Sequence, residues 1–149
     1  MTLDPQSAVG CVNLGQIHQI QGENDAALRL YTLAIKIDPT LLSAQESAAY
    51  LGYEEGSVDQ ARGRLEEAAR LAPSGSPAAQ RVGALLGILA ERAGSGDGWQ
   101  GVAALRRGDL QLVQGNRDRA LGLYREAAGD PRSAPAARQM LERLNAGGK

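Results

Sequence analysis

The sequence predicts an all-α protein, a stack of antiparallel helix pairs with about eight helices, the last of which caps the stack. The first observation is a repeat: Gly22 recurs as Gly56, and Pro39 recurs as Pro73, each after 34 residues. The second observation is that apolar residues recur at helical spacing within each period. A period of this length with helical spacing inside it indicates stacked helical hairpins rather than a single globular core.

Small side chains recur at the same interval, which is the third observation. Ala27 and Ala34 have counterparts at Ala61 and Ala68. Small residues allow helix axes to approach closely, while larger residues such as Tyr31 fill the space that remains. We therefore expect the recurring alanines to face the interior of the stack.

The first half of the chain contains the clearest elements. The pattern predicts helices over residues 4–21 and 24–37, separated by Gly22, which stands where a helix ends. It predicts the same hairpin over residues 41–55 and 58–71. A proline after each second helix disfavours helical geometry in the preceding residue, so the chain turns there.

The second half repeats less regularly. Residues 78–93 form a strongly apolar predicted helix, and a glycine-rich run follows it. Further helices are predicted over residues 99–114, 117–128 and 134–145. We assign a single domain, 1–149, with these parts: repeat 1 at about 8–41, repeat 2 at about 42–75, a degenerate helix at 76–93, a linker at 94–98, a repeat-like hairpin at 99–131 and a capping helix at 133–145.

These residues resemble the tetratricopeptide repeat (TPR) family. The family pattern is an aromatic residue, Leu-Gly, Tyr, Ala, an aromatic residue and a closing Pro at fixed spacing. The chain carries at those places Cys11, Leu14, Gly15, His18, Ala27, Tyr31 and Pro39. The second unit keeps Ala61, Leu65, Ala68 and Pro73, while its first helix has Gln45, Ala48, Ala49 and Gly52 instead of the family residues.

The resemblance implies a right-handed superhelical α-solenoid with a concave groove that binds a peptide or a helix of a partner protein. Carried over by position, the groove residues are Val12, Gln16, Gln19, Glu46, Tyr50, Tyr53 and Glu54. Related domains that grip a C-terminal carboxylate use a Lys and an Asn where this chain has Val12 and Gln16, so that subtype is disfavoured. Because Glu46 and Glu54 are acidic, we expect a groove that prefers neutral or basic segments.

Composition limits the other classes of function. A net charge of −1, with basic and acidic residues interleaved, gives no basic face for nucleic acid. One cysteine cannot form an internal disulfide, and no apolar run approaches the length of a membrane span. We expect a cytoplasmic protein without membrane insertion, or a periplasmic or membrane-tethered one if the chain is a fragment. The preference for Arg over Lys, with abundant Ala and Gly, favours a bacterial source.

No pattern points to catalysis, a metal or a cofactor. Cys11 and His18 lie two helical turns apart, about 10 Å along the axis, which is too far for a direct hydrogen bond. The glycine-rich run at 94–98 lacks the following Lys-Ser or Lys-Thr of a phosphate-binding loop. Trp99 is expected to pack against the helix at 78–93 rather than to anchor a ligand. We therefore expect a protein that is not an enzyme and needs no cofactor.

Two functions remain open. The leading one is a non-catalytic interaction module, an adaptor or co-chaperone-like scaffold for a protein or peptide partner. The alternative is a structural component of a bacterial cell-envelope or secretion assembly that associates with itself. The oligomeric state separates them, because a concentration-independent monomer favours the adaptor and a stable homo-oligomer favours the assembly component.

Overall fold

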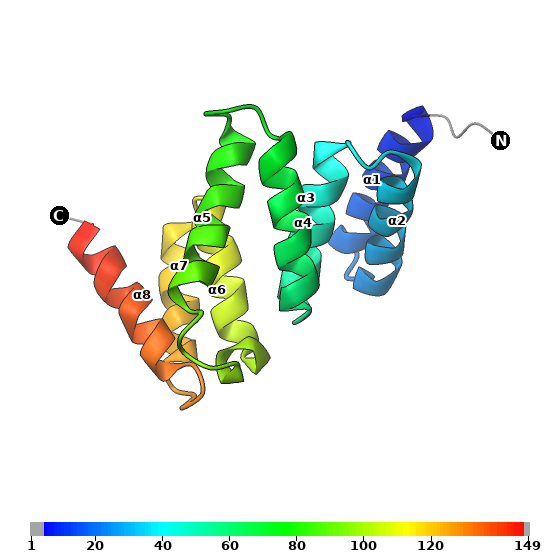
Figure 1. The fold of residues 1–149 in the computed structure, drawn as a ribbon. Helices are drawn as coiled ribbons and strands as arrows, with labels where there is room; N and C mark the ends of the chain where they lie inside the picture. Colours follow the sequence, from blue (N-terminus) through cyan, green and yellow to red (C-terminus); the bar gives the residue numbers. More distant parts are fainter. Residues whose placement is uncertain (1–4, 148–149) are drawn as a thin grey trace. The chain divides into compact units, whose positions relative to one another are not determined.

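The computed structural model describes residues 5–147 and is all-helical over that range, with eight α-helices, one short 3-10 helix and no strand (Figure 1). The elements are α1 Pro5–Ile20, α2 Asn24–Ile37, α3 Leu42–Glu54, α4 Val58–Leu71, α5 Pro77–Glu91, η1 Gly98–Gly101, α6 Ala103–Val113, α7 Arg117–Ala127 and α8 Ala134–Gly147. This confirms the predicted fold class. The predicted start of the first helix at residue 4 lies outside the described residues.

The chain forms two compact units. The first contains the residues up to Tyr53 together with Ser57–Val82, and the second contains Glu54–Gly56 together with the residues from Gly83 onward. Helix α5 spans the division, because its first turns belong to the first unit and its remainder to the second. Each unit is described separately below.

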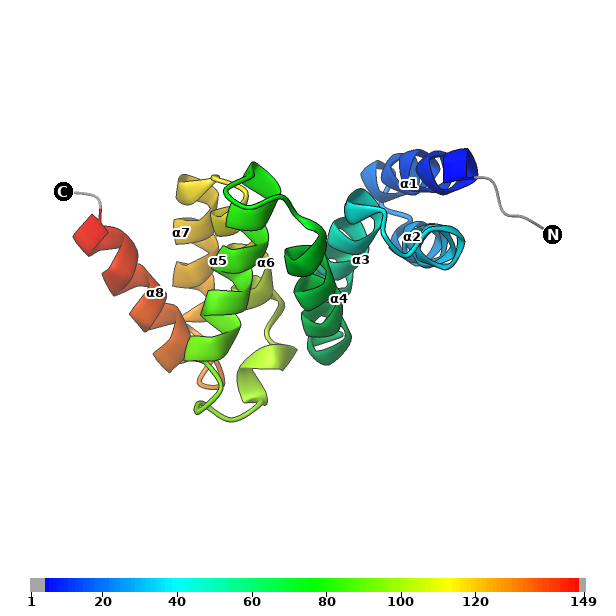
Figure 2. The ribbon, with the colours of Figure 1, turned by 45° about the horizontal axis from the view of Figure 1, so that its top comes forward.

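In the first unit, three helices share one core. Helix α1 lies beside α2 in both views (Figures 1 and 2). The fully or nearly fully buried residues of this core are Ala8, Val12, Ala27, Tyr31, Ala34, Ala44, Ala48 and Leu51. Helix α4 buries Ala61, Leu65 and Ala68 in the same unit. The alanines of the 34-residue repeat are therefore all buried, as their spacing predicts.

Three hairpins use the same turn, which ends on a glycine with positive φ. Gly22, Gly56 and Gly115 have φ values of +81°, +96° and +87°. In each case the next residue donates its backbone N–H to a carbonyl five residues earlier, at 2.8–2.9 Å. A residue with a Cβ is strained in this left-handed region, so glycine is the residue that suits the turn. The shared turn gives the three hairpins a common local geometry.

The second unit contains the α6–α7 hairpin, with α8 packed on α7. Helix α8 buries Ala134, Ala136, Ala137 and Met140 and exposes polar residues on its other side. One element differs from prediction: residues 99–114 do not form a continuous helix, because the backbone of Val102 is extended, with φ −99° and ψ +102°. The break between η1 and α6 leaves both Trp99 and Val102 buried.

Candidate functional site

The three predicted groove residues of α1 differ in exposure. Val12 is buried in the core of the first unit, and Gln16 is exposed. Gln19 is half-buried, and its Oε1 accepts a 2.7 Å hydrogen bond from the Tyr31 hydroxyl. Of these three side chains, that of Gln16 is the one most open to a ligand.

On α3, Glu46 and Tyr50 belong to a local hydrogen-bonded cluster. Glu46 is only 9% exposed, and its carboxylate accepts hydrogen bonds from Arg81 Nε at 2.7 Å and from Arg81 Nη2 at 3.2 Å. The half-buried Tyr50 donates its hydroxyl proton to Glu46 Oε1 at 2.7 Å. The negative charge of Glu46 is therefore balanced by a guanidinium from a residue 35 positions away.

The other two predicted groove residues lie at the end of α3. Tyr53 is fully buried. Glu54, in the second unit, is half-buried, with its carboxylate 3.8 Å from Arg107 Nε and its carbonyl accepting hydrogen bonds from Arg106. Both carboxylates that suggested an acidic groove thus have a guanidinium partner. The groove assignment as a whole remains a prediction.

Helix α1 has an exposed apolar surface that the sequence analysis did not identify. Four of its large apolar residues are exposed: Val9 (47%), Leu14 (46%), Ile17 (51%) and Ile20 (86%). The helix contains no Asp, Glu, Lys or Arg. The absence of these four residue types from α1 was detectable from the sequence, but the exposure of its apolar side chains was not.

The 100° rotation per residue divides this surface into two adjoining sides. The α1 groove side contains Val9, Gln16 and Ile20, and the α1 edge contains Gly10, Leu14 and Ile17. The groove side includes the exposed predicted residue Gln16. The edge includes no predicted site residue.

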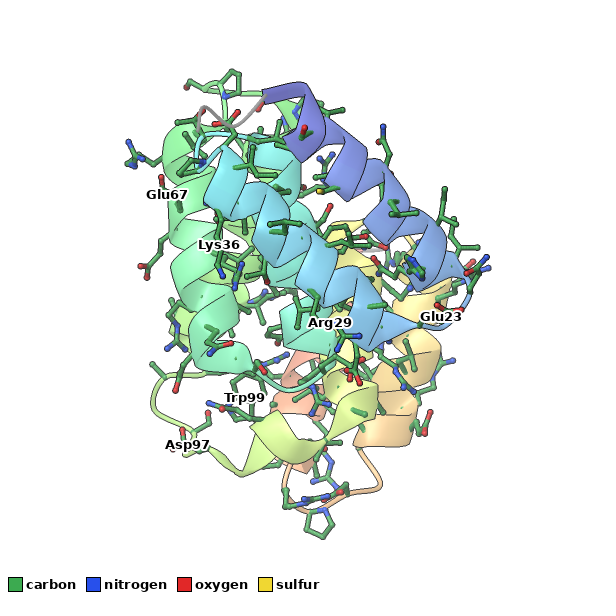
Figure 3. All side chains as sticks on the ribbon, turned by 90° about the vertical axis from the view of Figure 1, so that its right-hand side faces the viewer. Glu23, Arg29, Lys36, Glu67, Asp97 and Trp99 are labelled. Atoms are coloured by element: carbon green, nitrogen blue, oxygen red, sulfur yellow. The ribbon has the colours of Figure 1, made fainter. Side chains whose placement is uncertain are left out.

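A shallow depression of about 420 Å³ also runs along α2. Its lining residues are Asp25, Leu28, Arg29, Thr32, Leu33 and Lys36. Figure 3 labels Arg29 and Lys36 on this helix, and both side chains are exposed. Two cations and a carboxylate on one open helix face do not select a particular ligand.

The structure also places Cys11, His18 and Trp99, which the sequence analysis weighed as candidates for chemistry or ligand binding. No group of three or more His, Cys, Asp or Glu side chains in residues 5–147 could hold a metal ion. Cys11 packs against the core, and His18 Nδ1 lies 2.6 Å from Glu23 Oε2. Trp99 is buried with the Arg92 guanidinium 4.9 Å from its ring centroid. Over the same range, no helix is both long enough and apolar enough to cross a membrane.

The buried tyrosines predict a loss of stability at high pH. Burial raises the pKa of Tyr31, Tyr50 and Tyr124, and the neighbouring Glu46 and Asp109 add to the effect at the last two. The folded chain therefore retains protons that the unfolded chain loses near pH 10. The contribution of these neutral tyrosines to the free energy of unfolding is fully present below about pH 10 and is lost as the pH rises above it.

Urea unfolding at a series of pH values, followed by circular dichroism, measures this effect. We expect the free energy of unfolding to fall above about pH 10, and to fall less steeply in Tyr50→Phe. An equal slope in the wild type and in Tyr50→Phe would contradict the assignment of this loss to Tyr50.

Helical hairpins joined by a common glycine turn, with small residues buried between them, define a helical-repeat protein. Residues 11–44 match the family model for the tetratricopeptide repeat. Residues 11–44 therefore form a tetratricopeptide repeat, as the resemblance indicated. No curated protein matches the chain. Repeats of this kind generally serve as non-catalytic scaffolds for protein–protein interaction.

Proposed function

We propose that the chain is a non-catalytic adaptor that binds an extended peptide or a helix of a partner protein. The observation that carries this proposal is the α1 groove side, where an exposed amide lies between two exposed apolar side chains on a helix without Asp, Glu, Lys or Arg. Val9, Gln16 and Ile20 all lie in the first unit. Val12 and Tyr53 are buried, so their side chains would not contact the ligand.

The chemistry of the groove side favours an uncharged, apolar segment. The Gln16 amide can both donate to and accept from a peptide backbone. Val9 and Ile20 supply apolar area on either side of it, and a rigid helix holds all three in place. Because Arg81 neutralises Glu46, we no longer expect a basic segment to be preferred.

Peptides selected from a displayed random library provide the test. We expect Gln16→Ala and Ile20→Ala each to weaken the selected peptide about tenfold in calorimetry, because each removes one part of the contact. Leu33→Ala on α2, where the leucine is 45% exposed, is the matched control and should bind as the wild type does. Unchanged affinity in both α1 variants would refute the assignment.

The dependence of peptide affinity on salt concentration provides a second test. Binding between uncharged surfaces should change little between about 0.05 M and about 0.5 M salt, because there are few charge pairs to screen. A steep loss of affinity with salt would instead place the ligand on a charged surface, such as the α2 depression with Arg29 and Lys36.

Substitutions at Glu46 are poor probes of binding. Glu46→Lys would place a second cation beside Arg81 in a largely buried position and so would disturb the fold. The amide and apolar variants on α1 avoid this problem because their side chains are exposed.

The α1 edge supports the second candidate, a structural component that associates with itself. Its side chains are apolar and exposed but lie on a different side of α1 from Gln16. Assignment to a bacterial cell-envelope or secretion assembly, the cytoplasmic location and the division into repeats remain predictions.

A further inference from the structure

The α1 edge combines two exposed large side chains with one open position. Leu14 and Ile17 are about half exposed, and a Cβ placed on Gly10 would have no atom within 4 Å. All three residues lie on one side of a helix without Asp, Glu, Lys or Arg. The described part of the chain has one other exposed large apolar residue outside α1, which is Leu33.

We propose that the α1 edge binds the same edge of a second copy of the chain, with the two helices antiparallel about a two-fold axis. A two-fold contact places the same surface on both copies, so a charged edge would meet its own charge. The α1 edge has no charge to repel its copy. For the same reason it offers nothing that would favour an acidic or basic partner.

The spacing of the edge is self-complementary. If the two-fold axis passes midway between Asn13 and Leu14, Gly10 of one copy lies opposite Ile17 of the other, and the same pairing occurs a second time across the axis. Each isoleucine can then enter the space that the missing side chain of Gly10 leaves open. Side chains of one helix that enter gaps on another are the usual basis of close helix packing. Leu14 of both copies lies at the centre of this contact.

The size of the contact sets its strength. A helix of 16 residues is about 24 Å long, and one pair of such helices buries less than the roughly 1,200 Å² of a standard stable interface. We therefore expect a weak dimer that depends on concentration, with a dissociation constant on the order of 100 µM.

Sedimentation equilibrium of the full chain, from about 10 µM to about 1 mM, tests the proposal. The wild type should shift from monomer towards dimer across this range. Ile17→Gln should weaken association at least tenfold by removing the inserted side chain. Gly10→Ile should weaken it similarly, because isoleucine then meets isoleucine across the axis. Circular dichroism confirms that each variant is folded.

The exchanged variant, Gly10→Ile with Ile17→Gly, tests the pairing itself. It restores an isoleucine opposite a glycine at both places and should recover association to within about threefold of the wild type. Leu33→Gln on α2 is the control and should associate as the wild type does. A chain that stays monomeric throughout, an exchanged variant no stronger than the single ones, or an equal loss in Leu33→Gln would each overturn the proposal.

This inference does not depend on the proposed peptide groove. The edge variants leave Val9, Gln16 and Ile20 in place, so they should lose association while retaining peptide affinity. Loss of peptide affinity in the edge variants, with association intact, would refute the separation of the two sides and with it the dimer contact.

Discussion

Asp109→Ala is expected to lower the free energy of unfolding by about 3–5 kcal/mol, because it leaves a buried guanidinium without its carboxylate. Asp109 is fully buried, and its Oδ1 accepts hydrogen bonds of 2.7 Å from Arg92 Nη2 and from the Tyr124 hydroxyl. Arg92 Nη1 donates to the other carboxylate oxygen. The same guanidinium lies over the ring of Trp99, so the loss would affect several elements of the second unit.

Urea unfolding of the variant, followed by circular dichroism, measures this effect. Glu67→Ala is the control, because the Glu67–Arg70 pair lies at the surface and should contribute little. A double variant, Arg92→Met with Asp109→Leu, should recover much of the lost stability by replacing both charges with apolar groups. A loss in Asp109→Ala no larger than that in Glu67→Ala would show that the buried pair is not a major source of stability.

Gly15→Ala is expected to lower the free energy of unfolding by up to about 2 kcal/mol. A Cβ on Gly15 would lie 2.6 Å from Tyr31 Cε1, and the Tyr31 ring is fully buried. Alanine favours a helix interior by about 1 kcal/mol, but overpacking in a closed core costs about 1–3 kcal/mol. Gly10→Ala in the same helix has open space and should be neutral or stabilising. A stabilised Gly15→Ala would contradict this account.

The other hairpins of the chain suggest a second substitution that should offset the destabilisation by Gly15→Ala. The α6–α7 hairpin repeats the close pair as Gly108 and Tyr124, also 16 residues apart, with a Cβ-to-ring distance of 2.9 Å. The second hairpin has Ala49 and Leu65 at this spacing, so a residue larger than glycine occurs together with one smaller than tyrosine. Gly15→Ala with Tyr31→Leu should therefore show a favourable coupling of about 1 kcal/mol or more in a double-mutant cycle. Additive effects would rule out steric contact as the cause.

Several features of the fold could be predicted from the sequence because they recur in every hairpin. Gly22 and Gly56 recur because each hairpin needs a residue with positive φ, and Ala27 and Ala61 recur because each helix pair needs a close contact. Such requirements are local or repeat at a constant interval. They therefore appear directly in the spacing of residue types.

The candidate site was less predictable. Spacing placed Val12, Glu46 and Tyr53 on the first helix of a hairpin, but it did not show that all three are buried. Whether a residue on a helix faces a neighbour or solvent depends on which helices pack beside it. The break at Val102 could not be predicted for the same reason. It leaves Trp99 buried in the second unit, and that burial depends on the neighbouring elements.

From the sequence alone came the 34-residue period, the helix ends at glycine and proline, and the inward alanines, because these follow from backbone geometry and helix periodicity. Tertiary structure alone decided that Arg81 neutralises Glu46, that Arg92 and Asp109 are buried together, and that Ile17 and Ile20 stay exposed. Those outcomes depend on partners distant in the chain, and the spacing within one helix carries no information about them.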